Sequence, residues 1–317
     1  MLKLPHFKSR LSANPPGGES EFMNFKTVSR GLILPIVFLV GSVSAAAQGS
    51  SVPTAKVNSG LDWNESFEGS TGSSGQDMEL NSSATFHFAR YSIGAGIPVY
   101  FSRAILPNGV TTSEGVGDLS VTLGATWNHS ILNYATALTG SAPTGDSNKG
   151  FSTGHATFDW NNRIDHGFKL FTPFLDAGVA NTLTDTLYFH RPFMSYGYLA
   201  HAEAGVDIDL THSFTFTVSG YKIAPWGTQT IISRDVVNGA VGSGGNNGRV
   251  FEVNHLTTGS ASLNYDDGFT AGLSFRPKPY LNLELGFTRS LSFEYNMFSW
   301  GIDINMTRLI SRKNPIQ

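Results

Sequence analysis

The sequence predicts an all-β fold: a transmembrane antiparallel up-and-down β-barrel of about 12 strands that follows a cleaved signal peptide. Three observations predict it. Segments of about ten residues alternate apolar and polar side chains, as strands do when one face meets lipid and the other faces the barrel interior. Aromatic residues flank short connections between these segments, and short connections alternate with long ones.

The composition favours a barrel over a helical membrane protein. Charged residues make up 14 % of the 317 residues, whereas a soluble protein has about a quarter. Glycine (35 residues) and aromatic residues (12 %) are abundant, and the body of the chain has no apolar run long enough for a membrane-spanning helix. The chain has no cysteine, so a disulfide framework and a thiolate metal site are excluded.

The N-terminus carries the pattern of a secretory signal. From Met23 the chain reads MNFKTVSRGLILPIVFLVGSVSAAAQG, with Lys26 and Arg30 before a short apolar stretch and an A-x-A cleavage motif that ends at Ala47. A membrane anchor is disfavoured, because the stretch is too short to span about 30 Å of hydrocarbon. We expect residues 1–47 to be an N-terminal extension and signal peptide, with translation from Met23, and residues 48–317 to be the barrel.

The alternation is clearest in FSWGIDINM, residues 298–306, where Phe298, Trp300 and Ile302 share one face and the small or polar residues share the other. No helical period of comparable length competes with this pattern. Including this one, the predicted strands lie at 57–63, 80–88, 91–99, 118–127, 131–141, 154–164, 171–179, 196–208, 214–218, 268–276, 280–289 and 298–306.

Aromatic residues next to the short connections separate the barrel from its main alternative, a secreted β-sandwich, which also alternates. A membrane interface favours rings of aromatic side chains, and a sandwich has no such requirement. The pairs are Phe88 and Tyr91, Trp127 and Tyr134, Trp160 and Phe168, Phe214 and Phe216, and Phe275 and Tyr280.

Connection lengths predict the topology. Short links that we assign to the periplasm alternate with longer outer ones near 68–77, 102–116, 142–153, 181–193, 222–254 and 290–296. The segment 255–265 could form a thirteenth strand, but a barrel with both ends in the periplasm needs an even number. We therefore assign that segment to the long outer loop at about 222–254 or to an extension of the strand that follows.

The polar face of the predicted strands supplies the candidate lumen residues. His201 and Glu203 lie two residues apart on one face, a spacing that allows a hydrogen bond between them within a polar lumen network. Because acids predominate on this face, an open lumen should prefer cations mildly. The candidates are Asp118, Asp159, Arg163, Asp176, His201, Glu203, Asp207, Glu284 and Asp303.

No residue pattern points to catalysis, a metal or a cofactor. The stretch Gly117-Asp118-Leu119-Ser120 has the order GDLS rather than the GDSL of serine esterases, and it is better explained as a bend that sets strand register. The nine histidines show no metal-ligand spacing. Without residues 1–47 the net charge is about −6, which argues against a nucleic-acid partner.

Three motifs in order give a family resemblance. GIPVY (96–100), GVGDLSVTLGATW (115–127) and TALTGSAPTGD (136–146) resemble the MetA-pathway of phenol degradation family of outer-membrane proteins, as do SFRPKPYLNLELGF (274–287) and a final strand with WG. The resemblance covers residues 57–307. It implies a twelve-stranded barrel in the bacterial outer membrane that moves small, often hydrophobic or aromatic, compounds.

The chain departs from many outer-membrane barrels at its C-terminus. The last strand is followed by TRLISRKNPIQ rather than by the terminal aromatic residue that the assembly machinery reads. The expected partners are outer-membrane lipid, a small solute and that machinery, and the expected function is a passive channel or uptake route. An adhesive barrel that displays its outer loops is the alternative, and a membrane-embedded hydrolase ranks below it.

Overall fold

A computed structural model of the protein describes residues 60–72, 75–106, 109–183, 188, 191–234 and 254–313. The signal peptide expected at 23–47 lies outside these residues, and so does 235–253 of the expected outer loop. Among the described residues, no helix is long and apolar enough to cross a membrane.

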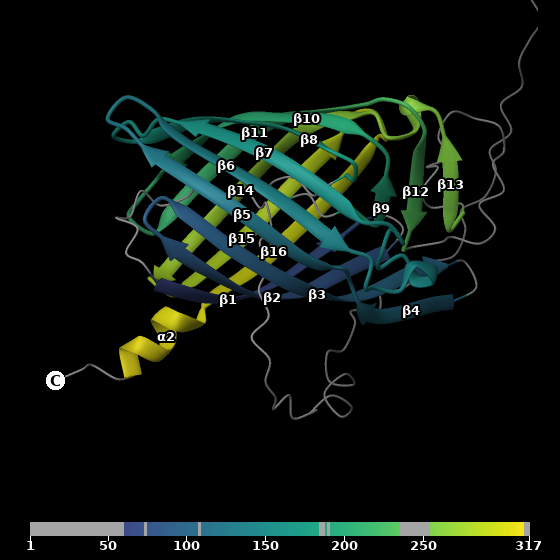
Figure 1. Cartoon of the computed structure of the whole chain (residues 1–317), viewed down its shortest axis with the longest axis horizontal. Helices are drawn as coiled ribbons and strands as arrows, with labels where there is room; N and C mark the ends of the chain where they lie inside the picture. The colour runs from purple at the N-terminus through teal and green to yellow at the C-terminus, as the bar shows by residue number, and fades with distance from the viewer. Residues whose placement is uncertain are drawn as a thin grey trace, which may run out of the picture. The chain divides into compact units, whose positions relative to one another are not determined.

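Twelve antiparallel strands close into a barrel, as the alternation predicts (Figure 1). Strand β1 pairs with β16, which joins the two ends of the sheet, and β2 pairs with β3 to complete the ring. A further strand, β4 (Gly109–Val116), pairs with β3 beyond the ring. The ring strands are β1 (Gly60–Thr71), β2 (Gly75–Phe88), β3 (Tyr91–Leu106), β5 (Leu119–Asn128), β6 (Asn133–Ala142), β7 (Thr157–Asp165), β8 (Phe171–Ala180), β10 (Leu199–Asp209), β11 (Phe214–Pro225), β14 (Asp266–Lys278), β15 (Leu281–Ser290) and β16 (Tyr295–Asn305).

The two ends of the barrel differ. One end has short turns and the C-terminal helix α2 (Met306–Lys313), which contacts β1 through a hydrogen bond from the Trp63 backbone N–H to Thr307 Oγ1 (2.8 Å). The other end has three short strands, β9 (Phe193–Tyr196), β12 (Gln229–Ser233) and β13 (Leu256–Gly259) (Figure 1). Since outer-membrane barrels have short periplasmic turns, we assign the α2 end to the periplasm and the other end to the outside.

The faces of the strands are apolar outside and polar inside. On β16, Phe298 is 60 % exposed whereas Ser299 is 5 % exposed, so the apolar face of FSWGIDINM points outward. A row of cross-strand partners continues this apolar surface over β3, β5, β6, β7 and β8. Its members are all exposed: Ile93, Leu123, Leu138, Trp160 and Val179. This outer surface matches the hydrocarbon of a membrane.

Aromatic pairs gather beside the short turns. Phe88 and Tyr91, with ring centroids 5.6 Å apart, and Trp127 and Tyr134, 5.4 Å apart, flank short turns as predicted, and their rings are in contact. Two further ring contacts join aromatic residues near short turns: Phe168 with Phe171 (4.7 Å) and Phe214 with Phe275 (4.3 Å).

The three short outer strands form a separate sheet, in the order β13-β12-β9, which we call the cap sheet. Two 3-10 helices accompany it, η2 (Ser147–Lys149) and η3 (Ala261–Leu263). The segment 255–265 lies outside the barrel ring, as the even strand count requires, because its strand β13 pairs with β12. The expected outer loop at 222–254 begins later than predicted, since β11 runs to Pro225.

Two expected long loops are largely strand. The chain near 68–77 and 102–116 continues the pairings β1–β2 and β3–β4, whereas near 290–296 a four-residue turn at 291–294 joins β15 to β16. Above the membrane both faces of a strand meet water or the cap, so apolar alternation fades while backbone pairing continues. The sequence pattern therefore marks the membrane-embedded part of these strands and misses their outer extensions.

Two further boundaries differ from the prediction. The strand expected at 196–208 divides into β9 and β10 at Gly197, whose φ of +146° favours glycine. Residues 306–313 form helix α2, although the sequence was expected to end on a strand followed by a polar tail. Eight residues are too few to show a helical period beside twelve alternating strands.

The lipid-facing row gives a stability prediction. Leu123→Arg places a charge near the middle of the apolar surface and should lower the free energy of unfolding in phospholipid vesicles by about 2–4 kcal/mol. Urea titration followed by tryptophan fluorescence measures the change. Val110→Arg is the matched control, because Val110 is equally exposed but lies on the β3–β4 hairpin beyond the ring. Equal losses for the two variants would contradict the assignment of the apolar surface to lipid.

Candidate functional site

An arginine binds three carboxylates on the inner wall formed by β7, β8 and β10. Arg163 on β7 lies 2.9 Å from Asp176 (Nη1 to Oδ2), 3.5 Å from Asp165 and 3.6 Å from Asp207. The guanidinium carbon also lies 4.3 Å from the centroid of the Phe174 ring. The three carboxylates are buried or nearly so, and so is Arg163. A buried charge needs partners of opposite charge, which these four groups provide for each other. We call this group the Arg163 cluster.

Further toward the outer end, a histidine reaches across a strand. Nε2 of His201 on β10 lies 2.9 Å from Oδ1 of Asp159 on β7, although β8 separates the two strands. The strand between them has Gly178 at that place, where a Cβ would come within 2.5 Å of the imidazole. The sequence pattern pointed to Glu203 as a partner of His201. In the structure Asp159 pairs with His201, and Glu203 accepts a hydrogen bond from Ser219 Oγ (2.5 Å).

The wall formed by β15, β16, β1 and β2 is acidic. Glu79, Glu68 and Glu284 occupy one cross-strand row, in which Gly301 separates Glu68 from Glu284. We call these three glutamates the acidic row. Asp303 lies two residues further along β16, toward the periplasmic end, and Asn282 Nδ2 donates to Glu284 (2.6 Å) and weakly to Asp303 (3.4 Å).

Asp118 has a different environment from the other predicted lumen residues. It lies in the bend between β4 and β5, where its Oδ1 accepts a hydrogen bond from the backbone N–H of Gly145 (3.0 Å). The neighbouring Leu119 N–H donates to Thr144 Oγ1 (2.8 Å). The GDL and PTGD motifs therefore bind each other, which gives Asp118 a role in the bend that sets the register.

Two arginines near the outer end connect the short outer strands to two separate strands of the wall, β14 and β2. Arg191, which precedes β9, lies 3.5 Å from Asp266 on β14. Arg234, which follows β12, lies 3.4 Å from Asp77 on β2 and donates to the backbone oxygen of Arg191. We call these four residues the arginine bridge. Asp266 also accepts hydrogen bonds from Tyr221 and from Ser290.

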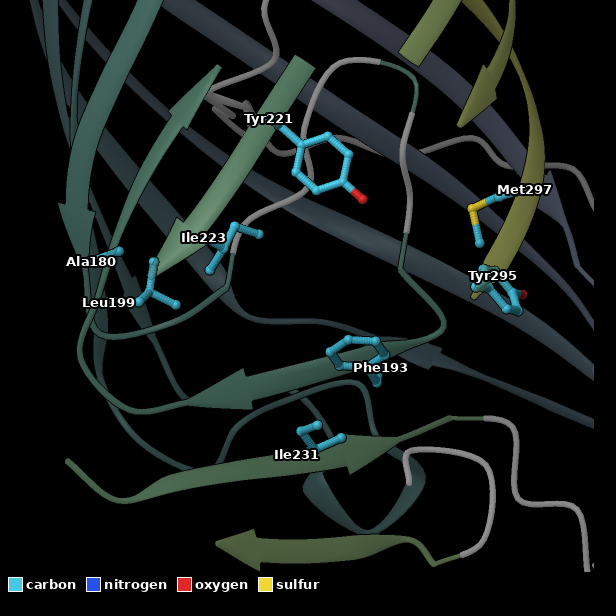
Figure 2. Packing of buried hydrophobic residues seen from close by; sticks show 8 residues of the cluster. All are labelled: Ala180, Phe193, Leu199, Tyr221, Ile223, Ile231, Tyr295 and Met297. Carbon is cyan, nitrogen blue, oxygen red and sulfur yellow. The ribbon is translucent and has the colours of Figure 1, made fainter. Parts of the chain in front are cut away.

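An apolar cluster lies beneath the cap sheet, on the side that faces the barrel (Figure 2). Phe193 on β9 and Ile231 on β12 come from the cap, and side chains of β11 and β16 come from the wall. This cluster makes the outer part of the interior apolar, whereas the Arg163 cluster and the acidic row are polar. The buried members are Ala180, Phe193, Leu199, Tyr221, Ile223, Ile231, Tyr295 and Met297.

The structure brings only some of the predicted residues together. Arg163, Asp176 and Asp207 meet in one cluster, as do Asp159 and His201, and Glu284 lies near Asp303. Sequence reasoning missed the acids of β1 and β2 and the whole arginine bridge. Glu68 and Asp77 alternate with outward residues in their strands, but they fall in stretches interpreted as an outer loop.

Chemistry other than ion pairing has little support in the interior. Within the described part of the chain, no group of three or more His, Asp or Glu side chains is placed to hold a metal ion. Ser219 and Thr217 donate to carboxylates, and these contacts stabilise buried charges.

The chain was compared with known proteins. No family model matches it, and no curated protein matches it. Among solved structures, the crystal structure of the COG4313 outer membrane channel from Pseudomonas putida F1 is similar, with a TM-score of 0.53 and 12 % identity, over 80 % of this chain and 98 % of that one. The KdgM porin follows at a TM-score of 0.42 and 11 % identity, over 76 % of this chain and 98 % of that one.

At 12 % identity the likeness to the channel shows the fold alone, and the porin, with a TM-score below 0.5, carries no argument. Together with the apolar outer surface, the fold identifies an outer-membrane β-barrel. The barrel implied by the motif resemblance is thus confirmed. Membership of the phenol degradation family stays a prediction.

The Arg163 cluster predicts a large loss of stability on substitution. Arg163→Met removes the cation and leaves three carboxylates close together, so the free energy of unfolding should fall by about 3–5 kcal/mol. Urea unfolding in vesicles at neutral pH measures it. Arg90→Met is the control, because Arg90 is exposed in the β2–β3 turn and its loss should change stability by less than about 0.5 kcal/mol. A change for Arg163→Met as small as the control's would show that the cluster is solvated.

Proposed function

We propose that the protein is a passive outer-membrane channel or uptake route for small compounds, hydrophobic or aromatic ones included. The observation that carries the proposal is the arrangement of charged side chains inside a closed barrel. A barrel of twelve strands is wider than the eight-stranded kind that its own side chains fill, and narrower than sixteen-stranded porins. On strand number alone, a pore of this width would pass one small solute.

The acidic row supports a preference for cations on this route. Glu284 and Asp303 are half-buried, whereas the residues of the same wall nearer the cap, such as Thr288 and Ser290, are fully buried. On this wall Glu284 and Asp303 are therefore more accessible than Glu68, which is 8 % exposed. Rings and rows of carboxylates attract cations and repel anions.

The arginine bridge limits passage at the outer end. Asp266 on β14 and Asp77 on β2 are separated in the ring by β15, β16 and β1, so a chain of contacts between them crosses part of the interior. Tyr100, whose ring centroid lies 4.8 Å from the Arg234 guanidinium carbon, stacks on Phe151 and extends this barrier. A solute must pass beside or displace these side chains.

The solute class is supported by two features. The apolar cluster under the cap sheet offers contacts to a hydrophobic solute at the outer end, before it meets the polar walls. The motifs in 96–146 resemble a family associated with small, often hydrophobic or aromatic, compounds.

Single-channel recording tests the proposal. The refolded mature protein should give stepwise conductance in a planar bilayer, and added phenol should reduce or interrupt it. Silence from a protein that is folded and inserted would overturn the channel function. Heat-modifiable mobility on a gel checks the folding of each preparation.

Cation preference depends on the acidic row. The reversal potential in a potassium chloride gradient should indicate cation selectivity for the wild type, and Glu68→Gln with Glu284→Gln should shift it toward zero. Glu65→Gln is the matched control, because Glu65 is on β1 like Glu68 but on the outward face, where it accepts hydrogen bonds from Trp63 and Ser82. Anion selectivity of the wild type, or an equal shift in the control, would contradict the role of the row.

The arginine bridge should restrict the conductance. Arg234→Gln removes the ion pair with Asp77 and should raise the single-channel conductance or the fraction of time spent open. Asp77→Asn should have the same effect, and the double variant should add little, because both changes break one interaction. Unchanged conductance in all three variants would place the narrowest point elsewhere.

A further inference from the structure

Two glycines face each other on the inner wall and leave a hollow. Gly272 on β14 and Gly286 on β15 are direct cross-strand partners, and their register continues to Ser299 on β16. Glycine in the interior of a strand weakens that strand, and it often marks a place where another group approaches the backbone closely. The group here is Tyr188. A Cβ on Gly272 would lie 2.0 Å from the Tyr188 ring, and a Cβ on Gly286 would lie 2.3 Å from the Tyr188 Cβ.

Polar contacts fix Tyr188 in this hollow. Its hydroxyl lies 2.9 Å from Ser274 Oγ, and its backbone oxygen accepts hydrogen bonds from Ser299 (2.8 Å) and Thr288 (3.3 Å). The residue is 7 % exposed, and its φ is +58°, a left-handed conformation that is uncommon for tyrosine. The surrounding wall therefore determines where this ring lies.

The hydroxyl acts as a neutral group in this place. Burial is the main cause that raises the pKa of Tyr188, and the nearby Glu284 adds to it. The phenol consequently stays protonated at neutral pH and can donate one hydrogen bond and accept another. Ser274 Oγ donates to Glu284 (3.3 Å), so it is placed to accept a hydrogen bond from the phenol.

We propose that this hollow, made by Gly272, Gly286, Ser274 and Ser299, is a binding site for a planar aromatic ring with one hydroxyl group, and that the chain's own Tyr188 occupies it. The chemical class follows from the occupant, because the tyrosine side chain is 4-methylphenol attached through its methyl carbon. Gly272 and Gly286 have no side chains, which leaves space for the face of the ring, and Ser274 Oγ is the hydrogen-bond partner of the hydroxyl.

Self-occupation has a consequence for transport, which rests on the channel function proposed above. A phenolic solute that enters the hollow competes with Tyr188, so the apparent affinity of the site is reduced by the fraction of time that the site is vacant. Such a solute would move Tyr188 away from the wall. The binding itself does not depend on whether the barrel conducts.

The experiment empties the site and measures binding of 4-methylphenol. Titration calorimetry on the folded Tyr188→Ala barrel in detergent should show binding at least about tenfold tighter than in the wild type, because the competitor is gone. Toluene, which lacks the hydroxyl, should bind Tyr188→Ala more weakly than 4-methylphenol does. Ser274→Ala in the same background should remove this difference between the two probes.

Gly272→Ala combined with Tyr188→Ala is the matched control. The three atoms nearest to a Cβ on Gly272 all belong to the Tyr188 ring, so the added methyl group enters space that the first substitution vacates. The double variant should fold and lose the binding of 4-methylphenol. Equal binding by Tyr188→Ala and the double variant, or no binding by a folded Tyr188→Ala, would overturn the proposal.

A second variant covers a failure of Tyr188→Ala to fold. Gly272→Ala in the otherwise natural chain should displace the Tyr188 ring and lower the free energy of unfolding, and Tyr188→Ser, which has no atom beyond the γ position, should remove that penalty. An undiminished stability of Gly272→Ala would contradict the seating of the ring. Conductance separates the two proposals: binding without conductance would refute only the channel function, and conductance without binding would refute only the aromatic site.

Discussion

Closure of the sheet is the constraint on which the rest of the structure depends. In hydrocarbon a backbone N–H or C=O without a partner costs several kcal/mol, so a membrane sheet can have no free edge. The pairing of β1 with β16, from Asn64 opposite Asn305 to Thr71 opposite Phe298, removes the edge that the first and last strands would otherwise expose. Once the ring is closed, alternate residues of every strand must face lipid, and the remainder must face each other inside.

The interior chemistry follows from that division. Side chains that cannot face lipid are gathered in a narrow space, where a charge is tolerated only beside an opposite charge or a hydrogen-bond donor. Arg163 among Asp165, Asp176 and Asp207 satisfies this condition, and so does His201 beside Asp159. The same networks that allow polar residues inside the barrel therefore join nearby strands of its wall.

Local sequence patterns predicted the parts of this design that depend on a strand's own two faces. The twelve-strand ring, the apolar face of Phe298 and the exclusion of 255–265 from the ring follow from alternation and parity. Contacts between distant segments could not be predicted. His201 meets Asp159 across an intervening strand, and the arginine bridge joins residues before β9 and after β12 to two separate strands. Such pairs depend on barrel curvature and on loop paths, and neither leaves a periodic signal.

The cap and the walls form a single unit in energetic terms. Arg191 and Arg234 belong to the outer connections, yet their partners Asp266 and Asp77 are wall residues. A solute that disturbs the bridge exposes two buried carboxylates as well as two arginines, and recovering those ion pairs favours return to the closed arrangement. Since the apolar cluster lies directly beneath the cap sheet, a hydrophobic solute can compensate for this cost there in a way that water or a small ion cannot. The outer end would thus discriminate by apolar contact and the inner end by charge, with one barrel wall contributing to both.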